Sequence, residues 1–168
     1  MSGINSKGKS QTIFATNPDQ PAISELIKRK LDPLGLLRSY MSEIPEGLYY
    51  TAEHEWIKIE KDGTVTVGIT DYAQNALTDI VYVELPEVDE HFESRDEFTI
   101  VESVKSASPV FIPFAGTVIS INLELEDAPE LVNKSPYNNG WIAKFSVNNS
   151  EELNSLMTAK EYETHIKE

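Results

Sequence analysis

Short alternating runs of apolar and polar residues, each ended by a turn, constrain the fold of this chain most strongly. Residues 56–60 and 64–69 are two such runs, and they flank Lys61-Asp62-Gly63. An Asp-Gly dipeptide between two alternating runs is a strong signal for a tight β-hairpin. The pattern therefore predicts a mainly β, antiparallel domain that begins near Tyr49.

The rest of the chain continues this pattern. Further strands are predicted over residues 80–85, 97–102, 110–112, 117–125 and 141–147. A short helix at residues 71–77 should be capped by Asp71, a loop should span residues 129–139, and Ser150 should cap a helical tail that reaches residue 166. Similar strand–loop–strand arrangements precede and follow Lys105, which favours two similar halves packed as a flattened β-sandwich.

Lys105 lies in a short polar break between two predicted strands. A lysine in such a place is usually an ordinary surface residue. A hairpin tip is, however, also a suitable place for a cofactor held through an amide bond, because a modifying enzyme can reach it there. The local pattern alone leaves both interpretations open.

Composition excludes several kinds of chemistry. The chain contains no cysteine, so disulfides, thiolate metal sites and cysteine nucleophiles are absent. Residues 41–168 carry 25 acidic residues against eight Lys/Arg, a net charge of −17. This charge disfavours nucleic acid and anionic membranes as partners and suits a carrier that meets basic patches on other proteins, although solubility alone explains it equally well. No catalytic cluster and no metal-ligand spacing around His54 is present, so neither a catalytic nor a metal site is predicted.

Residues 1–40 form a separate N-terminal extension, and residues 41–168 form the globular domain. The extension is rich in polar residues up to residue 21, and residues 22–31 place apolar side chains at helical spacing. It is predicted to be disordered or weakly helical. A basic amphipathic presequence would direct the protein to the mitochondrial matrix, whereas an upstream translation start, with Met41 as the other initiator, fits a cytoplasmic bacterial protein.

Seven blocks of residues, in order along the chain, resemble the H proteins of the glycine cleavage system. The blocks are His54-Glu55-Trp56, residues 68–74, residues 79–86, Val101-Glu102-Ser103-Val104-Lys105, residues 130–133, residues 135–137, and Gly140-Trp141. The resemblance covers about residues 45 to 166. It implies a hybrid barrel-sandwich of the lipoyl/biotinyl-domain type, with short helices and a C-terminal helix.

The resemblance also implies a function. Lipoate would be amide-linked to Lys105, and Glu102, Ser103 and Val104 would be recognised by the lipoylating enzyme. The protein would be a non-catalytic carrier of aminomethyl groups from the glycine decarboxylase (P protein) to the tetrahydrofolate-dependent aminomethyltransferase (T protein). Dihydrolipoamide dehydrogenase (L protein) would reoxidise it, and Glu55 and Ile69 would line the cleft that shelters the aminomethyl-lipoyl group.

Four residues depart from the usual family pattern. Ser106 replaces a common alanine, Pro109 stands where many relatives are polar, and Ala76 lacks a polar side chain that some relatives offer. Arg95 occupies a turn position that is often glycine, and a positive φ there would cost about 1 kcal/mol or somewhat more.

Several alternatives stay open on the sequence. A lipoyl-relay protein, which would pass lipoate on to other enzyme complexes, would share every one of these sequence features. A biotinyl domain is disfavoured because the residues that flank Lys105, Val104 and Ser106, are not methionines. An enzyme is the least supported alternative, because the sequence contains no catalytic cluster. For Glu102 and Glu55, the alternative to a functional role is an ordinary position on the protein surface. Gly68 is predicted to mark a bulge or a close approach, and Trp56 and Trp141 are predicted core residues. Tyr137 either faces a partner or closes its own loop.

Overall fold

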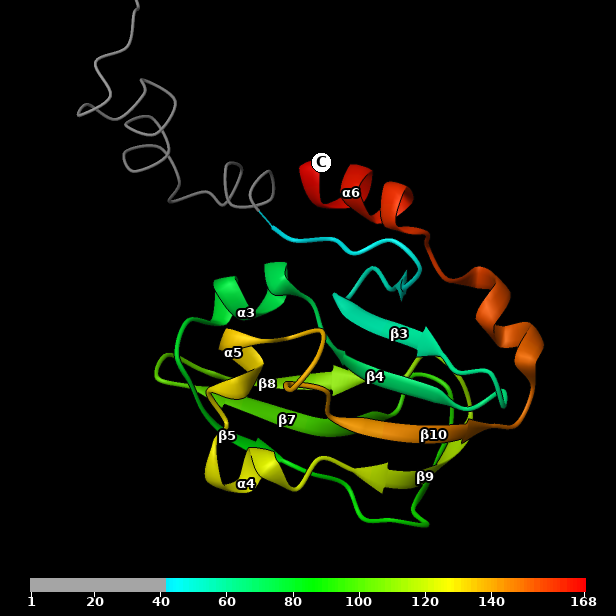
Figure 1. The fold of residues 1–168 in the computed structure, drawn as a ribbon, viewed down its shortest axis with the longest axis horizontal. Coiled ribbons are helices and arrows are strands. Elements are labelled where there is room, and N and C mark those ends of the chain that lie inside the picture. The colour runs from blue at the N-terminus through cyan, green and yellow to red at the C-terminus, as the bar shows by residue number, and fades with distance from the viewer. Residues whose placement is uncertain (1–41) are drawn as a thin grey trace, which may run out of the picture. The chain divides into compact units, whose positions relative to one another are not determined.

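Two antiparallel sheets face each other across an apolar core in the computed structural model, which describes residues 42–168 (Figure 1). The predicted extension, residues 1–40, and the possible initiator Met41 lie outside the described residues. One sheet has the strand order β2-β3-β4-β10-β9-β6 and the other β5-β7-β8, so the sandwich is not a closed barrel. This is the predicted mainly β class with short helices and a C-terminal helix.

The strands and helices follow each other along the chain as Figure 1 labels them. The strands are β2 (Tyr49–Tyr50), β3 (Glu55–Ile59), β4 (Val65–Ile69), β5 (Ile80–Glu84), β6 (His91–Phe92), β7 (Glu97–Ser103), β8 (Ala107–Phe111), β9 (Gly116–Ile121) and β10 (Ala143–Val147). The helices are α3 (Asp71–Leu77), α4 (Glu124–Asp127), α5 (Leu131–Lys134), the 3₁₀ helix η3 (Ser150–Ser155) and α6 (Ala159–Lys167).

The predicted Asp-Gly hairpin joins β3 to β4. Ile59 pairs with Val65 at its base, and the Asp62 carboxylate accepts a hydrogen bond from the Thr64 amide at 3.0 Å. Gly63 has a φ of 89°, a conformation that glycine adopts without the steric cost of a Cβ atom.

Several predicted element boundaries were wrong. The strand predicted over 110–112 spans residues 107–111, and the one predicted over 141–147 begins at Ala143. The strand predicted over 117–125 ends at Ile121, because Asn122 donates from Nδ2 to the carbonyls of Asn139 and Trp141 and the chain then enters α4. The loop predicted over 129–139 contains the single turn α5. The helical tail divides into η3 and α6, which are separated by extended residues at Leu156 to Thr158.

The predicted helix caps each lie one residue away from the observed ones. Thr70, and not Asp71, caps α3 by accepting from the Ala73 amide, and Asn149, and not Ser150, caps η3. Thr158 and Glu161 form a capping box at the start of α6. In each case a side-chain oxygen satisfies an amide that the first helical turn leaves unpaired.

Phe145 on β10 is the centre of the core between the sheets. Its ring meets those of Phe92, Phe98 and Phe114 edge-on, with centroids 5.4 to 6.3 Å apart. Such edge-to-face contacts are favourable beyond the area they bury. These aromatic residues therefore hold the two sheets together from both sides.

A second apolar cluster lies on the other side of β3, beneath α6. Trp56, which is 1% exposed, packs there with Tyr50, Tyr162 and Ile166, and its indole donates from Nε1 to the Pro136 carbonyl at 3.0 Å. The prediction of a core position is confirmed for Trp56. Trp141 is only half-buried, with Lys144 above its ring.

Gly68 lies directly opposite Trp56 in the β3–β4 pairing. A Cβ atom at Gly68 would lie 2.6 Å from Trp56 Nε1, which is too close for any side chain. Of the two predicted roles of Gly68, the structure shows the close approach.

Tyr137 joins the start of the described chain to α3. Its hydroxyl donates to the Glu43 carbonyl at 2.5 Å and accepts from the Asp71 amide at 2.9 Å. Burial raises the pKa of the Tyr137 phenol above its ordinary range. Tyr137 therefore does more than close its own loop, and its hydroxyl is used within the fold.

His54 anchors α6 to the sheet. Its Nδ1 lies 2.8 Å from the Tyr162 hydroxyl, which lies 2.8 Å from Thr70 Oγ1, and its ring contacts those of Tyr72 and His165. Burial first, and the neighbouring His165 second, lower the pKa of His54 to about 4. The neutral imidazole is therefore the form that the folded protein favours.

Gly68→Ala should reduce the free energy of unfolding by about 2 kcal/mol or more, because the new methyl group displaces the Trp56 indole. Urea unfolding followed by tryptophan fluorescence measures this. Gly63→Ala is the control: nothing lies within 4 Å of its Cβ position, so it should cost only the strain of its positive φ, about 1 kcal/mol. Equal losses in the two variants would contradict the close-packing explanation.

The contribution of His54 to the stability of the domain should decrease as the pH falls from about 6.5 to 4. The unfolded chain protonates His54 near its ordinary pKa of 6.5, whereas the folded chain does so only near 4, so acid favours unfolding across this interval. His54→Asn, which tolerates the positive φ of 78°, should remove much of this decrease in urea unfolding measurements. His91→Asn, on the exposed surface, should leave it in place, and a His54→Asn protein with the wild-type pH dependence would count against the assignment.

Candidate functional site

Lys105 lies in the tight turn that joins β7 to β8. Glu102 and Ala107 form the last cross-strand pair, and the Ser103 amide donates to the Ser106 carbonyl at 2.7 Å. The Ser103 hydroxyl accepts from the amides of Lys105 and Ser106, at 3.2 and 3.1 Å. This serine turn replaces the hydrogen bonds that the ladder no longer supplies and fixes the backbone on which Lys105 is exposed.

The Lys105 side chain lies against the end of α3. Nζ donates to the Ala76 carbonyl at 3.0 Å, and the neighbouring Val104 amide donates to the Asp79 carbonyl at the same distance. Within residues 42–168, no carboxylate lies within 4.0 Å of Nζ. Lys105 is thus exposed, held by one neutral acceptor, and free of an ion pair with this part of the chain. Ala76 contributes to the site through its backbone, so its missing polar side chain does not matter for this contact.

Glu55 occupies an unusual position for a carboxylate, because only 3% of its surface is exposed. Glu55 lies on the same face of β3 as Ile57, which belongs to the core between the sheets. The carboxylate accepts a hydrogen bond from the Thr51 hydroxyl at 2.5 Å. Burial raises the pKa of Glu55 to about 7, against the opposing effect of the Thr51 hydroxyl. A surface role for Glu55 is therefore excluded.

Ile69 is the direct cross-strand partner of Glu55 in the β3–β4 pairing. Its side chain is buried and belongs to the core between the sheets. The structure therefore brings Glu55 and Ile69 together as neighbours on one sheet face. Only Glu55 of the two lines the adjacent cavity, and Lys105 is not among the residues that line it.

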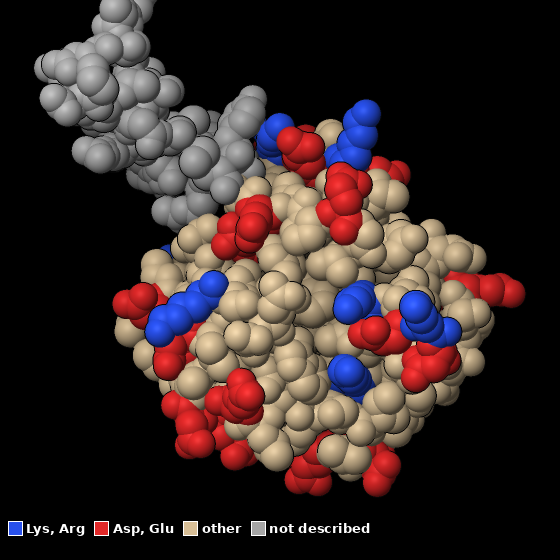
Figure 2. All heavy atoms as spheres, viewed as in Figure 1, with Lys and Arg blue, Asp and Glu red and all other residues tan. Residues whose placement is uncertain are grey.

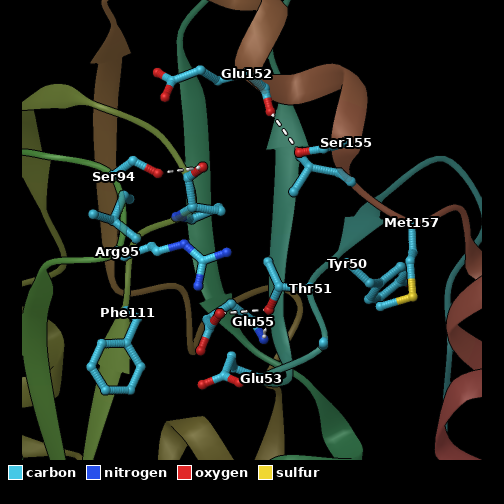
Figure 3. Close-up of a pocket in the computed structure, with 14 residues that line it drawn as sticks. Tyr50, Thr51, Glu53, Glu55, Ser94, Arg95, Phe111, Glu152, Ser155 and Met157 are labelled. Carbon is cyan, nitrogen blue, oxygen red and sulfur yellow. Dashed lines mark hydrogen bonds between the residues drawn. The ribbon is translucent and has the colours of Figure 1, made fainter.

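The cavity beside Glu55 has a volume of about 720 Å³ (Figure 3). Residues of both sheets and of η3 line it, and Thr51, Glu53, Arg95 and Phe111 are among them. In Figure 3 the Arg95 side chain extends into the cavity toward the side where Glu55 and Thr51 lie. The φ of Arg95 is 79°, so the expected backbone strain is present. Arg95 and Thr51 are cavity residues that the sequence did not predict, although the departure at residue 95 was a signal for the first.

Other features of the described residues limit the kind of site. Asp and Glu are spread over the visible face, with Lys and Arg among them (Figure 2). Within residues 42–168, no group of three or more His, Asp or Glu could hold a metal ion, and no helix is long and apolar enough to cross a membrane.

The fold and site define a β-sandwich of the lipoyl/biotinyl-domain type with an exposed lysine at one hairpin tip. The family model "Glycine cleavage H-protein" matches residues 48–168, and the chain belongs to this family. It is 51% identical over 126 residues to the glycine cleavage system H protein of Psychrobacter sp. (strain PRwf-1), covering 75% of this chain and 100% of that protein. The H protein of Staphylococcus carnosus (strain TM300) is 50% identical, with 74% and 98% covered.

A solved structure shows the same architecture. The crystal structure of a glycine cleavage system H protein from Mycobacterium marinum matches with a TM-score of 0.66 and 38% sequence identity. The match covers 71% of this chain and 95% of that one. The predicted family and fold class are thereby confirmed.

Glu55→Gln should become more stabilising as the pH rises. The unfolded chain ionises Glu55 near 4.5 and the folded chain near 7, so the contribution of Glu55 to stability decreases as the pH rises across this interval, and the glutamine variant lacks this decrease. The contribution of His54 is present in both proteins and cancels in their difference. Between pH 4 and 9, the difference in free energy of unfolding should move by about 2–3 kcal/mol in favour of Glu55→Gln. Urea titrations at both pH values measure it. The exposed Glu87→Gln should show little change, and a constant difference for Glu55→Gln would refute the assignment.

Proposed function

We propose that this protein is the lipoyl carrier of a glycine cleavage system, with lipoate attached to Lys105. It would carry the aminomethyl group from the P protein to the T protein and be reoxidised by the L protein, without catalysing any of these steps. The observation that carries the proposal is Lys105 itself, exposed at a hairpin tip and bonded to a single backbone carbonyl.

The residues around Lys105 fit a covalently held lipoyl group. Attachment requires neutral Nζ to attack the carbonyl carbon of an activated lipoyl adenylate: the C–N bond forms, the C–O bond to AMP breaks, AMP leaves, and Nζ releases a proton. The carbonyl of Ala76 holds Nζ without an ion pair that would oppose this loss of charge. A lipoyl group bound there would supply the thiol chemistry that a chain without cysteine lacks.

Recognition by the lipoylating enzyme is assigned to the three residues before Lys105. Ser103 holds the turn through its hydroxyl, so it presents the lysine in one conformation. Val104 is 68% exposed, and Glu102 is half-buried on the strand that leads to the turn. Of the three, Val104 and Glu102 expose side-chain surface to such an enzyme, whereas the buried Ser103 acts through the turn.

The cavity beside Glu55 supports a sheltering role. A carboxylate with a pKa of about 7 is largely ionised just above neutral pH, and burial excludes most water from it. Such a group attracts a cationic amine and shields it from hydrolysis. Ile69 does not line the cavity, so its part in the sheltering cleft would act through its cross-strand contact with Glu55. The acidic surface suits partner enzymes with basic docking patches.

Lys105→Arg should abolish lipoylation and glycine cleavage, because a guanidinium does not form the amide. Intact mass after incubation with a lipoate–protein ligase, lipoate and ATP measures the first effect. Glycine-dependent NADH formation with purified P, T and L proteins measures the second.

Lys134→Arg is the matched control, since Lys134 is also exposed but lies on α5. It should gain the lipoyl mass and support glycine cleavage as the wild type does. Lipoylation or full activity of Lys105→Arg would disprove the proposed function.

A further inference from the structure

The solvent-facing side of the three-stranded sheet carries apolar residues next to Lys105. On β7, Val101 points into the core, so Ile100 and Glu102 on either side of it point outward and are partly exposed. Pairing with β5 and β8 extends these two positions into two cross-strand rows. We call the six residues of these rows the outer sheet face: Tyr82, Glu102 and Ala107 in one row, and Glu84, Ile100 and Pro109 in the other.

An irregularity in β5 enlarges the apolar part of this surface. The pairing with β7 shifts register between Ile80 and Tyr82, and the consecutive residues Val81 and Tyr82 are both about half exposed, at 51% and 49%. A regular strand would turn one of them inward, whereas a bulge changes the direction of a side chain. The exposed Val104, whose amide bonds to Asp79, continues the apolar surface to the lysine turn.

The charges of this surface are complementary to a basic partner. The two carboxylates of the outer sheet face are Glu84 and Glu102, the face has no Lys, Arg or His, and Asp79 lies where β5 meets the lysine turn. Apolar side chains that are exposed together mark interaction surfaces more often than isolated ones do. An occupant of this face therefore needs apolar side chains for Tyr82 and Ile100 and basic groups for the two glutamates.

We propose that the outer sheet face is the docking surface for the enzyme that attaches lipoate to Lys105, an inference that rests on the proposed function. The argument is one of reach. The enzyme must bring its centre to an Nζ on a four-carbon stem that lies against Ala76, so its surface has to cover the residues around the turn. Enzymes that act later meet the far end of the longer lipoyl-lysine arm and do not need this contact.

The test is the rate of lipoylation of a double variant, Tyr82→Ser with Ile100→Ser. With a lipoate–protein ligase, lipoate and ATP, kcat/KM for the carrier should decrease at least about tenfold, because the apolar centre of the contact is removed. Ile119→Ser with Leu123→Ser is the matched control: both residues are exposed and lie outside the outer sheet face, and this variant should react within about twofold of wild type. Glu84→Lys should be slow at low salt and recover at high salt.

Two readouts separate docking from other causes. Acetylation of Lys105 by acetic anhydride should proceed equally in all variants, and near-UV circular dichroism should show the native fold; Pro109→Ser replaces the double variant if that one unfolds. Lipoylation of a folded double variant at the wild-type rate, or an equal loss in the control, overturns this inference alone. If the wild-type chain itself takes no lipoate on Lys105, the proposed function fails and this inference with it.

Discussion

The contact between Trp56 and Gly68 is the constraint on which most of this structure depends. It holds β3 and β4 in one register, because no residue with a side chain fits beneath the indole. That register places Glu55 opposite Ile69 on the side of the core, and Trp56 with Tyr50 on the side covered by α6. A slip of one residue would exchange the two sides, placing an indole between the sheets and the carboxylate under the helix. The cavity and the C-terminal helix therefore both rely on one missing Cβ atom.

The strands could largely be predicted from the sequence, because their signals are local. Alternation, the Asp62-Gly63 dipeptide and the polar break at Lys105 located the hairpins on both sides of the sandwich. Errors arose where a distant partner decides the outcome. β9 ends early because Asn122 bonds to a loop some twenty residues ahead, and the tail divides because Tyr50 forms a bridge with Met157. Apolar periodicity contains no information about such partners.

The candidate site was predictable to a similar extent. The exposed turn that carries Lys105 was predicted from its local pattern, and the attachment of lipoate there stays a prediction. The burial of Glu55 was not predictable, because its surroundings include segments distant along the chain: Phe111, Arg95 and η3 line the cavity beside it. The outward direction of both Val81 and Tyr82 likewise depends on a bulge that strict alternation does not predict. The turn at Lys105 could be predicted because its signal is local in the sequence, whereas these features are made by packing.

The hydrogen bond from Lys105 to Ala76 has a consequence for the loaded protein. In the unmodified chain, the Lys105 ammonium group lies at the carboxyl end of α3. There its positive charge interacts favourably with the carbonyl groups of the last helical turn. The proposed acylation would turn that ammonium into a neutral amide with one remaining N–H, so the last turn of a seven-residue helix would lose its cation. Short helices depend strongly on such end contacts. Hydrogen exchange of the α3 amides would therefore distinguish the proposed lipoylated form from the unmodified protein.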